Sequence, residues 1–558
     1  MARIEDYAMI GDLQTAALVE RGGSIDWLCF PRFDSAACFA ALLGDANNGR
    51  WLIAPTAGGT TSRRYRDETL ILETTWENDD GAVRVYDFMP PRDKAPDVVR
   101  IIEGIRGTVE MRSELVIRFD FGHIVPWMRR IDHARIAVAG PDGLCFRTDA
   151  RTRGENLRTV STFTVEEGER VAFTLTWFPS HGDLPPVIDP EDALVETNEF
   201  WREWVGACQA EIPDDWRAVI IRSLIVLKAL IYEPTGGIVA APTTSLPEWI
   251  GGVRNWDYRY CWLRFALWGL YTLGFDYEAN DFFNFMADAC GRGDRPLQIM
   301  YGIGGESKLE EKVLDHLDGY EGARPVRVGN AAYKQEQHDV WGALLDSVYL
   351  HARSREHLPE RVWPTLCRQV ECALESWREP DCGIWEVRGE RQHFTSSKVF
   401  CWVAADRGAR LAALHGERTL AARWQEAAGE IHADVCANGF DEELGSFVQS
   451  YGSNELDASL LLIPLVGFLP ASDAKVRGTV AAIEKNLVVD GFVLRYRTHE
   501  SGVDGLPAGE GVFLPCSFWL VDCLELLGRR EDAEVLFDRL IGLANDVGLL
   551  AEEYDPRA

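Results

Sequence analysis

The chain has few basic residues for its length. Lys and Arg together number 57 against 88 Asp and Glu, which gives a formal net charge of -31 at pH 7. Such an excess of acid repels nucleic acid and anionic membrane surfaces, and it cannot concentrate an anionic substrate. We therefore expect a small neutral substrate, with neither nucleic acid nor a membrane as partner.

Long apolar runs and cysteine motifs are also lacking. The sequence contains no apolar stretch of the roughly eighteen residues that a membrane span needs, and its N-terminus has no basic segment followed by an apolar one. The 13 cysteines form no C-x-x-C pair and show no Cys/His spacing typical of a metal site. These features predict reduced thiols, no metal or other cofactor, and a cytoplasmic location.

Two hydrophobic patterns divide the chain. Residues 1–195 contain short runs rich in β-branched and aromatic residues, separated by Gly, Asp and Asn at intervals typical of hairpins. After Pro190 the period changes from two to about 3.6, and helical segments, among them Tyr258–Leu273, follow one another to the end. We predict a multi-domain α+β protein with an antiparallel β-sandwich over 1–195, a linker helix region over 196–214 and an (α/α)6 barrel over 215–558. The long loops of such a barrel gather at one end around a pocket.

The densest cluster of aromatic and charged residues is APTTSLPEWIGGVRNWDYRYCWLR, residues 241–264. Sugar recognition needs this mixture, because a pyranose has an apolar face and a rim of hydroxyl groups. Structural ion pairs beneath a loop would give the same composition. The pattern leaves both interpretations open.

This segment resembles the signature of glycoside hydrolase family 15, the glucoamylase and trehalase-like enzymes, in which R-N-W-D-Y-R-Y-C-W-L-R is followed by Asp. Further stretches are similar to the family, including IEDYAMIGDLQTAALVERGGSIDWLCFPRFDS, RPVRVGNAAYKQEQHDVWG, DCGIWEVRGERQHFTSSKV and GEGVFLPCSFWLVDCLELLG. The resemblance implies a β-sandwich, an (α/α)6 barrel and inverting hydrolysis of an α-glucoside such as trehalose or a short α-glucan. In that reaction one carboxylic acid protonates the leaving oxygen while a carboxylate activates water.

The resemblance also implies roles for single residues. It places the general base at Glu510, in a loop whose flanking glycines allow backbone to approach a ligand. It places the general acid at the end of Q-x-Q-x-D-x-Y-G-E, where this chain has Ala343, and a sugar-binding Asp where it has Phe265. Asp339 lies one helical turn before Ala343 and is the nearest candidate for a replacement acid.

The other expected pocket residues come from the same motifs. They are Trp256, Asp257, Trp262, Arg264, Trp341, Trp385, Glu386 and Arg388, in addition to Phe265 and Ala343. For Trp385, Glu386 and Arg388, in the GIWEVRG segment, a buried Trp beside a structural Glu–Arg pair is an equally good interpretation.

Three functions stay open at this point. The first is a family 15 hydrolase of α-glucosides with another proton donor. The second is a repurposed scaffold that catalyses a cyclisation, isomerisation or elimination through a cationic intermediate, because losing two carboxylates suits a less polar substrate. The third is a catalytically inactive sugar-binding protein. Relatives usually continue beyond LLAEEYDPRA, so one wall of the barrel is expected to be either incomplete or closed by a partner subunit, and a homo-oligomer stays open.

Overall fold

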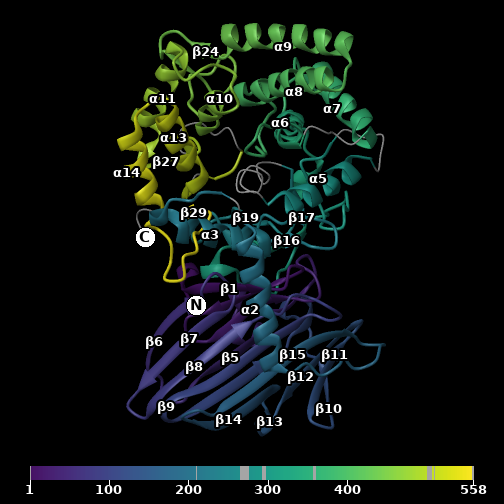
Figure 1. Cartoon of the computed structure of the whole chain (residues 1–558), viewed down its shortest axis with the longest axis vertical. Helices are drawn as coiled ribbons and strands as arrows, with labels where there is room; N and C mark the ends of the chain where they lie inside the picture. The colour runs from purple at the N-terminus through teal and green to yellow at the C-terminus, as the bar shows by residue number, and fades with distance from the viewer. Residues whose placement is uncertain are drawn as a thin grey trace.

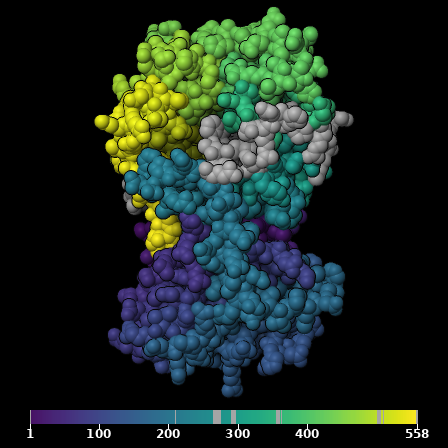
Figure 2. Space-filling view, in the orientation of Figure 1, coloured from purple at the N-terminus to yellow at the C-terminus, as the bar shows by residue number. Residues whose placement is uncertain are grey.

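The computed structural model describes residues 2–208, 210–263, 275–291, 297–355, 360–498, 505–507 and 509–555. They form a β domain at the N-terminus and a helical domain after it (Figure 1). The space-filling view in Figure 2 shows two lobes joined by a narrower waist. No helix within the described ranges is long and apolar enough to cross a bilayer.

Within residues 2–208, all of which are described, fifteen antiparallel strands build the β domain. They are β1 Tyr7–Gly11, β2 Ala16–Glu20, β3 Ser24–Cys29, β4 Ala37–Ala40, β5 Arg50–Pro55, β6 Thr60–Tyr65, β7 Leu72–Asn78, β8 Gly81–Phe88, β9 Asp97–Val116, β10 Trp127–Ile131, β11 Ala134–Ala139, β12 Asp142–Thr148, β13 Thr152–Glu155, β14 Arg158–Glu166 and β15 Arg170–Pro179. The first half of β9 pairs with β8 and β15, and its second half pairs with β5 and β14. This one long strand therefore joins two groups of strands, one around β8 and β15 and the other around β5 and β14. The predicted antiparallel β domain is confirmed.

The helix that leads out of the β domain is α2 Pro190–Gly206, and its first residues are ones that favour the start of a helix. Asp189 caps it by accepting hydrogen bonds from the N–H groups of Glu191 and Asp192, and Pro190 occupies its first turn. The predicted domain boundary at residue 195 falls within this helix. Figure 1 shows α2 running along the β domain toward the helical one.

Burial separates the later helices into inner and outer ones. They are α3 Asp214–Ala229, α5 Asp276–Gly291, α6 Asp339–Arg355, α7 Trp363–Ser376, α8 Thr395–Leu414, α9 Arg418–Asn438, α10 Leu462–Leu465, α11 Ala474–Asn486, α13 Leu514–Leu526 and α14 Arg530–Ile541. Helix α8 is buried on nearly every side, whereas α9 buries a single stripe at Trp424, Ala428, Ile431 and Val435. Accordingly α9 lies outside α8 at the top of Figure 1.

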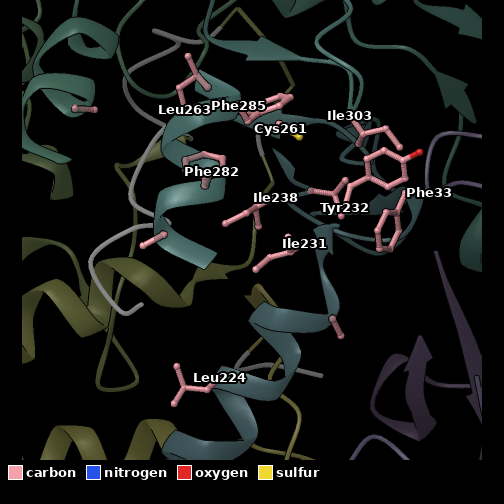
Figure 3. Close-up of a cluster of buried hydrophobic side chains, with 14 of the residues drawn as sticks. Phe33, Leu224, Ile231, Tyr232, Ile238, Cys261, Leu263, Phe282, Phe285 and Ile303 are labelled. Atoms are coloured by element: carbon pink, nitrogen blue, oxygen red, sulfur yellow. The ribbon is translucent and has the colours of Figure 1, made fainter. Parts of the chain in front are cut away.

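The hydrophobic core continues across the junction of the two domains. In Figure 3, Phe33 from the β domain lies beside Tyr232 and Ile303 of the helical domain, and all three belong to one buried cluster. The C-terminal segment also crosses the junction, because the buried side chain of Arg63 holds Asp546, with Nη2 2.6 Å from Oδ1. Asn545 donates to the carbonyl oxygens of Glu5 and Tyr7, each at 3.0 Å. The β domain thus holds the last part of the chain in place.

The predicted helix Tyr258–Leu273 does not begin as predicted. Strands β19 Asn255–Asp257 and β20 Cys261–Trp262 occupy this region, and they pair with β18 Thr244–Pro247 and β21 Met300–Tyr301 respectively. Residues 264–273 lie outside the described part of the chain. Extended backbone with alternating burial explains why aromatic and charged residues can share this segment.

Candidate active site

A pocket of about 330 Å³ lies in the helical domain, at the end where its long loops meet. The charged residues of its lining are Glu248, Arg254, Glu386, Arg388, Arg495 and Glu552. The aromatic residues of its lining are Trp256, Tyr258, Trp262, Trp385, Phe513 and Trp519. Flat apolar faces beside hydrogen-bonding groups suit a sugar, and the volume is that of a small-molecule site.

Glu386 is held in the pocket by a closed loop, residues 381–392. The loop is closed by backbone pairing between Asp381 and Gln392, and Asp381 is anchored in turn by the N–H of His338 and the hydroxyl of Ser397. Glu386 itself has a φ of 57°. This left-handed conformation is unfavourable for any residue that has a side chain. Such strain is concentrated at functional sites, and here it directs a carboxyl into the cavity.

Two tryptophans hold the same loop in place through their indole N–H groups. The indole N–H of Trp262 donates to Glu386 Oε1 at 2.7 Å. The indole N–H of Trp385 donates to the buried carboxylate of Asp457 at 2.8 Å. Trp262, Trp385, Glu386 and Arg388 therefore meet in one pocket, as predicted for the pocket wall.

Glu552 reaches the pocket from the far end of the chain. The next two residues form β29 Glu553–Tyr554, which pairs with β28 Val512–Phe513, and the Glu552 carbonyl accepts from the N–H of Leu514. Its side chain is exposed to the cavity although protein surrounds it. This burial, together with the charge of Glu248, raises the pKa of Glu552 from 4.5 to about 7.

Glu510 lies beside the pocket and not in its lining, as far as the described residues define it. Its side chain is 4% exposed and forms an ion pair with Arg495, while its Oε2 lies 3.7 Å from Arg254 Nη1. Burial raises the pKa of the Glu510 carboxyl and Arg495 opposes that rise. A base must reach a water molecule next to the substrate, and the role of Glu510 as base stays a prediction.

Three carboxylates around Arg495 have the spacing of a cation site. Glu248, Glu510 and Glu553 each bring an oxygen within 4.8 Å of the others. Arg495 forms ion pairs with all three, among them a contact of 2.8 Å from its Nη2 to Glu248 Oε2. A guanidinium group thus supplies the positive charge in this cluster.

Some residues of the RNWDYR segment line the pocket, and others are buried behind it. Asp257 is completely buried and binds Arg259, with an Oδ2 to Nη2 distance of 2.8 Å, so the structural interpretation holds for this residue. Trp256 lines the pocket, but the guanidinium groups of Arg388 and Arg327 lie 3.9 and 4.5 Å from its ring centre. These two groups cover much of the ring on which a sugar would stack.

The predicted acid position is in the hydrophobic core. Asp339, Trp341 and Ala343 lie on α6, each at most 5% exposed, and none of them is in the lining of the pocket described above. A Cβ on the neighbouring Gly342 would come within 2.1 Å of the Phe400 carbonyl oxygen, so α6 packs directly on α8 here. The alanine at 343 is thus a packing residue, and the prediction that it marks a lost proton donor does not fit this geometry.

Ala343→Glu is therefore expected to destabilise the protein without increasing its activity. The change would place an unpaired carboxylate in a packed core, which typically costs about 2–5 kcal/mol of unfolding free energy. Urea unfolding of the variant and the wild type measures this difference. A variant of normal stability with higher activity would contradict the assignment of residue 343 to the core.

Arg264 and Phe265, the other two predicted pocket residues, lie outside the described residues.

Comparison with known proteins identifies the family. Residues 215–557 match the model of glycosyl hydrolases family 15, and residues 1–143 match that of the trehalase-like N-terminal domain. The chain belongs to glycosyl hydrolases family 15. The match covers the helical domain that carries the pocket.

Individual family 15 relatives agree with this assignment. A trehalase of Mycobacterium tuberculosis is 45% identical over 590 aligned residues, covering 100% of this chain and 86% of the relative. A trehalase of Thermoplasma volcanium is 33% identical, covering 100% of this chain and 90% of the relative. A bacterial glucoamylase solved with acarbose has a TM-score of 0.73 at 11% identity, over 99% of this chain and 90% of that one. The chain is a glycosidase-like enzyme with the (α/α)6-barrel fold of this family.

Sequence reasoning missed several pocket residues of this family 15 enzyme. Glu248, Arg495 and Glu552 were not among the predicted site residues, although each lines the cavity. Glu552 stands in the short segment LLAEEYD, where two adjacent glutamates look like a solvated surface. Its place between a strand pair and the anchored residues 545–546 appears only in the fold.

Proposed function

We propose that the chain hydrolyses trehalose with inversion of configuration, using Glu386 as general acid and Glu552 as general base. The observation that carries this proposal is that these two carboxyl groups line one sugar-sized cavity from separate loops. Inverting glycosidases need such a pair, one carboxyl on each side of the bond that breaks. The trehalases among the relatives support trehalose as the substrate.

The two carboxyls have different surroundings. Glu552 is exposed to the cavity and experiences the charges of Glu248 and Arg495, whose side chains are 8% and 11% exposed. Glu386 is two residues from Arg388, which is 31% exposed and lies toward solvent. An inverting glycosidase needs the acid on the side of the leaving sugar and the base on the opposite side, and we assign these two sides to Glu386 and Glu552 respectively.

The charged lining does not favour a repurposed enzyme for a less polar substrate. Burying unpaired charges against an apolar ligand would cost free energy, whereas sugar hydroxyls can donate to the carboxylates and accept from the arginines. One of the two observations behind that alternative was Ala343, which lies in the core.

Incubating the purified protein with trehalose and following the anomeric protons by NMR tests the proposal. We expect two glucose molecules per trehalose, with α and β anomers initially equal, because only the sugar that is attacked by water inverts. Maltose and isomaltose in parallel serve as substrates of other linkage. Trehalose that stays intact would refute the proposal, whether or not it binds.

A further inference from the structure

Gln335 holds the backbone of Glu386 from outside the loop. Its side-chain Nε2 donates to the carbonyl oxygen of Glu386 at 3.1 Å and to that of Val387 at 3.3 Å. Gln335 does not belong to the loop 381–392, but lies between a short helical turn, Ala331–Lys334, and α6. The contact therefore ties the loop to the segment that leads into α6.

The orientation of Gln335 is fixed in turn by Gln337. Gln337 is 3% exposed, and its Nε2 donates to Gln335 Oε1 at 2.8 Å. An amide whose oxygen accepts this bond must present its nitrogen in the opposite direction, toward the loop. The Q-E-Q part of the sequence motif thus forms a chain of two amides that ends on the Glu386 backbone.

This contact acts where the backbone is least able to hold its own conformation. Glu386 has a φ of 57°, and a residue with a Cβ leaves this region unless its surroundings hold it there. Bonds to the carbonyls of residues 386 and 387 fix the two peptide groups that follow the strained residue. They also leave the Glu386 carboxyl directed into the pocket, where Trp262 contacts it.

We infer that Gln335 is a positioning residue that aims the Glu386 carboxyl at the glycosidic oxygen. This inference rests on the proposed function, since it needs Glu386 to act as the acid. Loss of the bond turns the strained peptide and displaces the carboxyl, and displacements of about 1 Å can cost about 10²-fold in rate. Substrate binding, which depends on other residues of the lining, stays largely unchanged.

The test compares Gln335→Leu with the wild type on trehalose and on α-D-glucosyl fluoride. Fluoride leaves without help from an acid, so a displaced proton donor lowers the rate on trehalose more than on the fluoride. We expect kcat on trehalose to fall roughly 10- to 100-fold, with KM within about threefold and kcat on the fluoride within about fivefold. Gln337→Leu should show the same pattern to a smaller degree.

Gln298→Leu is the matched control. Its side-chain amide also donates to two backbone carbonyls, those of Ser307 at 3.2 Å and Tyr333 at 2.8 Å, but it touches neither the loop nor the pocket lining. We expect its kinetics to match the wild type. Gln335→Asn keeps the amide but is too short to reach both carbonyls, and it serves if the leucine variant does not fold.

The outcomes separate the inference from the proposed function. Equal losses on both substrates, or a rate on trehalose like that of the wild type, in a folded Gln335 variant would overturn the inference while wild-type trehalose hydrolysis still stands. No glucose from the wild-type protein would overturn both. A selective loss on trehalose in Gln335→Leu or Gln335→Asn, with Gln298→Leu unchanged, would establish it.

Discussion

Replacing Glu386 by Gln is expected to lower kcat on trehalose by roughly 10³-fold, within the range of about 10²–10⁴ for a lost general acid. The substitution keeps the size and most contacts of the side chain, including the position to which Trp262 donates. It removes only the proton that the leaving glucose oxygen must receive. Since fluoride does not need this proton, kcat on α-D-glucosyl fluoride should fall by no more than about tenfold.

The matched control for this change is Glu390→Gln. Glu390 lies on the same loop, four residues later, and its side chain is exposed to solvent. Steady-state rates of the two variants should differ far more on trehalose than on the fluoride. If Glu386→Gln kept more than about a tenth of the wild-type rate on trehalose, another group would have to be the acid.

The fold could be predicted from the sequence because its signals are local. Alternating residues in the strands and the stripe Trp424, Ala428, Ile431, Val435 in α9 follow from which face of each element is buried. The predicted helix over residues 258–273 was wrong at its start because Cys261–Trp262 form the short strand β20, and alternation over two residues gives no local signal. Pairing with β21, which comes from later in the chain, decides its conformation.

The site could be predicted only in part. Trp262, Trp385, Glu386 and Arg388 were expected in the pocket wall, and they line it. The acid was assigned to position 343 because a motif gives sequence positions, whereas a role depends on the direction of a side chain. The contact of Gly342 with the Phe400 carbonyl turns this part of α6 toward the core, and no local pattern reveals it.

The importance of Glu552 depends on contacts that are distant in sequence. It approaches the pocket because the next residues pair with β28, about 40 residues earlier in the chain. It also depends on the ion pair between Arg63 and Asp546, which are 483 residues apart. The β domain thus anchors the segment on which the proposed base stands. The conformation of Glu386 also depends on residues outside its own motif, which hold its positive φ.

Glu552→Gln is expected to lower kcat by roughly 10²–10⁴-fold on trehalose and on α-D-glucosyl fluoride alike. A base is needed with either substrate because both reactions consume a water molecule, and an amide cannot take its proton. Glu443→Gln, a change at an exposed glutamate of the same domain, is the control and should leave both rates unchanged. In Glu552→Ala, azide should restore activity and yield the β-glucosyl azide, since a small anion can occupy the place of the carboxylate and the water.

The pH dependence gives an independent measure of the same residue. Burial and the charge of Glu248 raise the pKa of Glu552 to about 7, so the carboxylate needed for water activation is lost as the pH falls below that value. The acidic limb of kcat/KM in the wild type should therefore have its midpoint near pH 7, not near 4.5. Glu248→Gln removes a negative neighbour and should move this limb to lower pH. A limb that stays in place in Glu248→Gln would show that a group other than Glu552 titrates there.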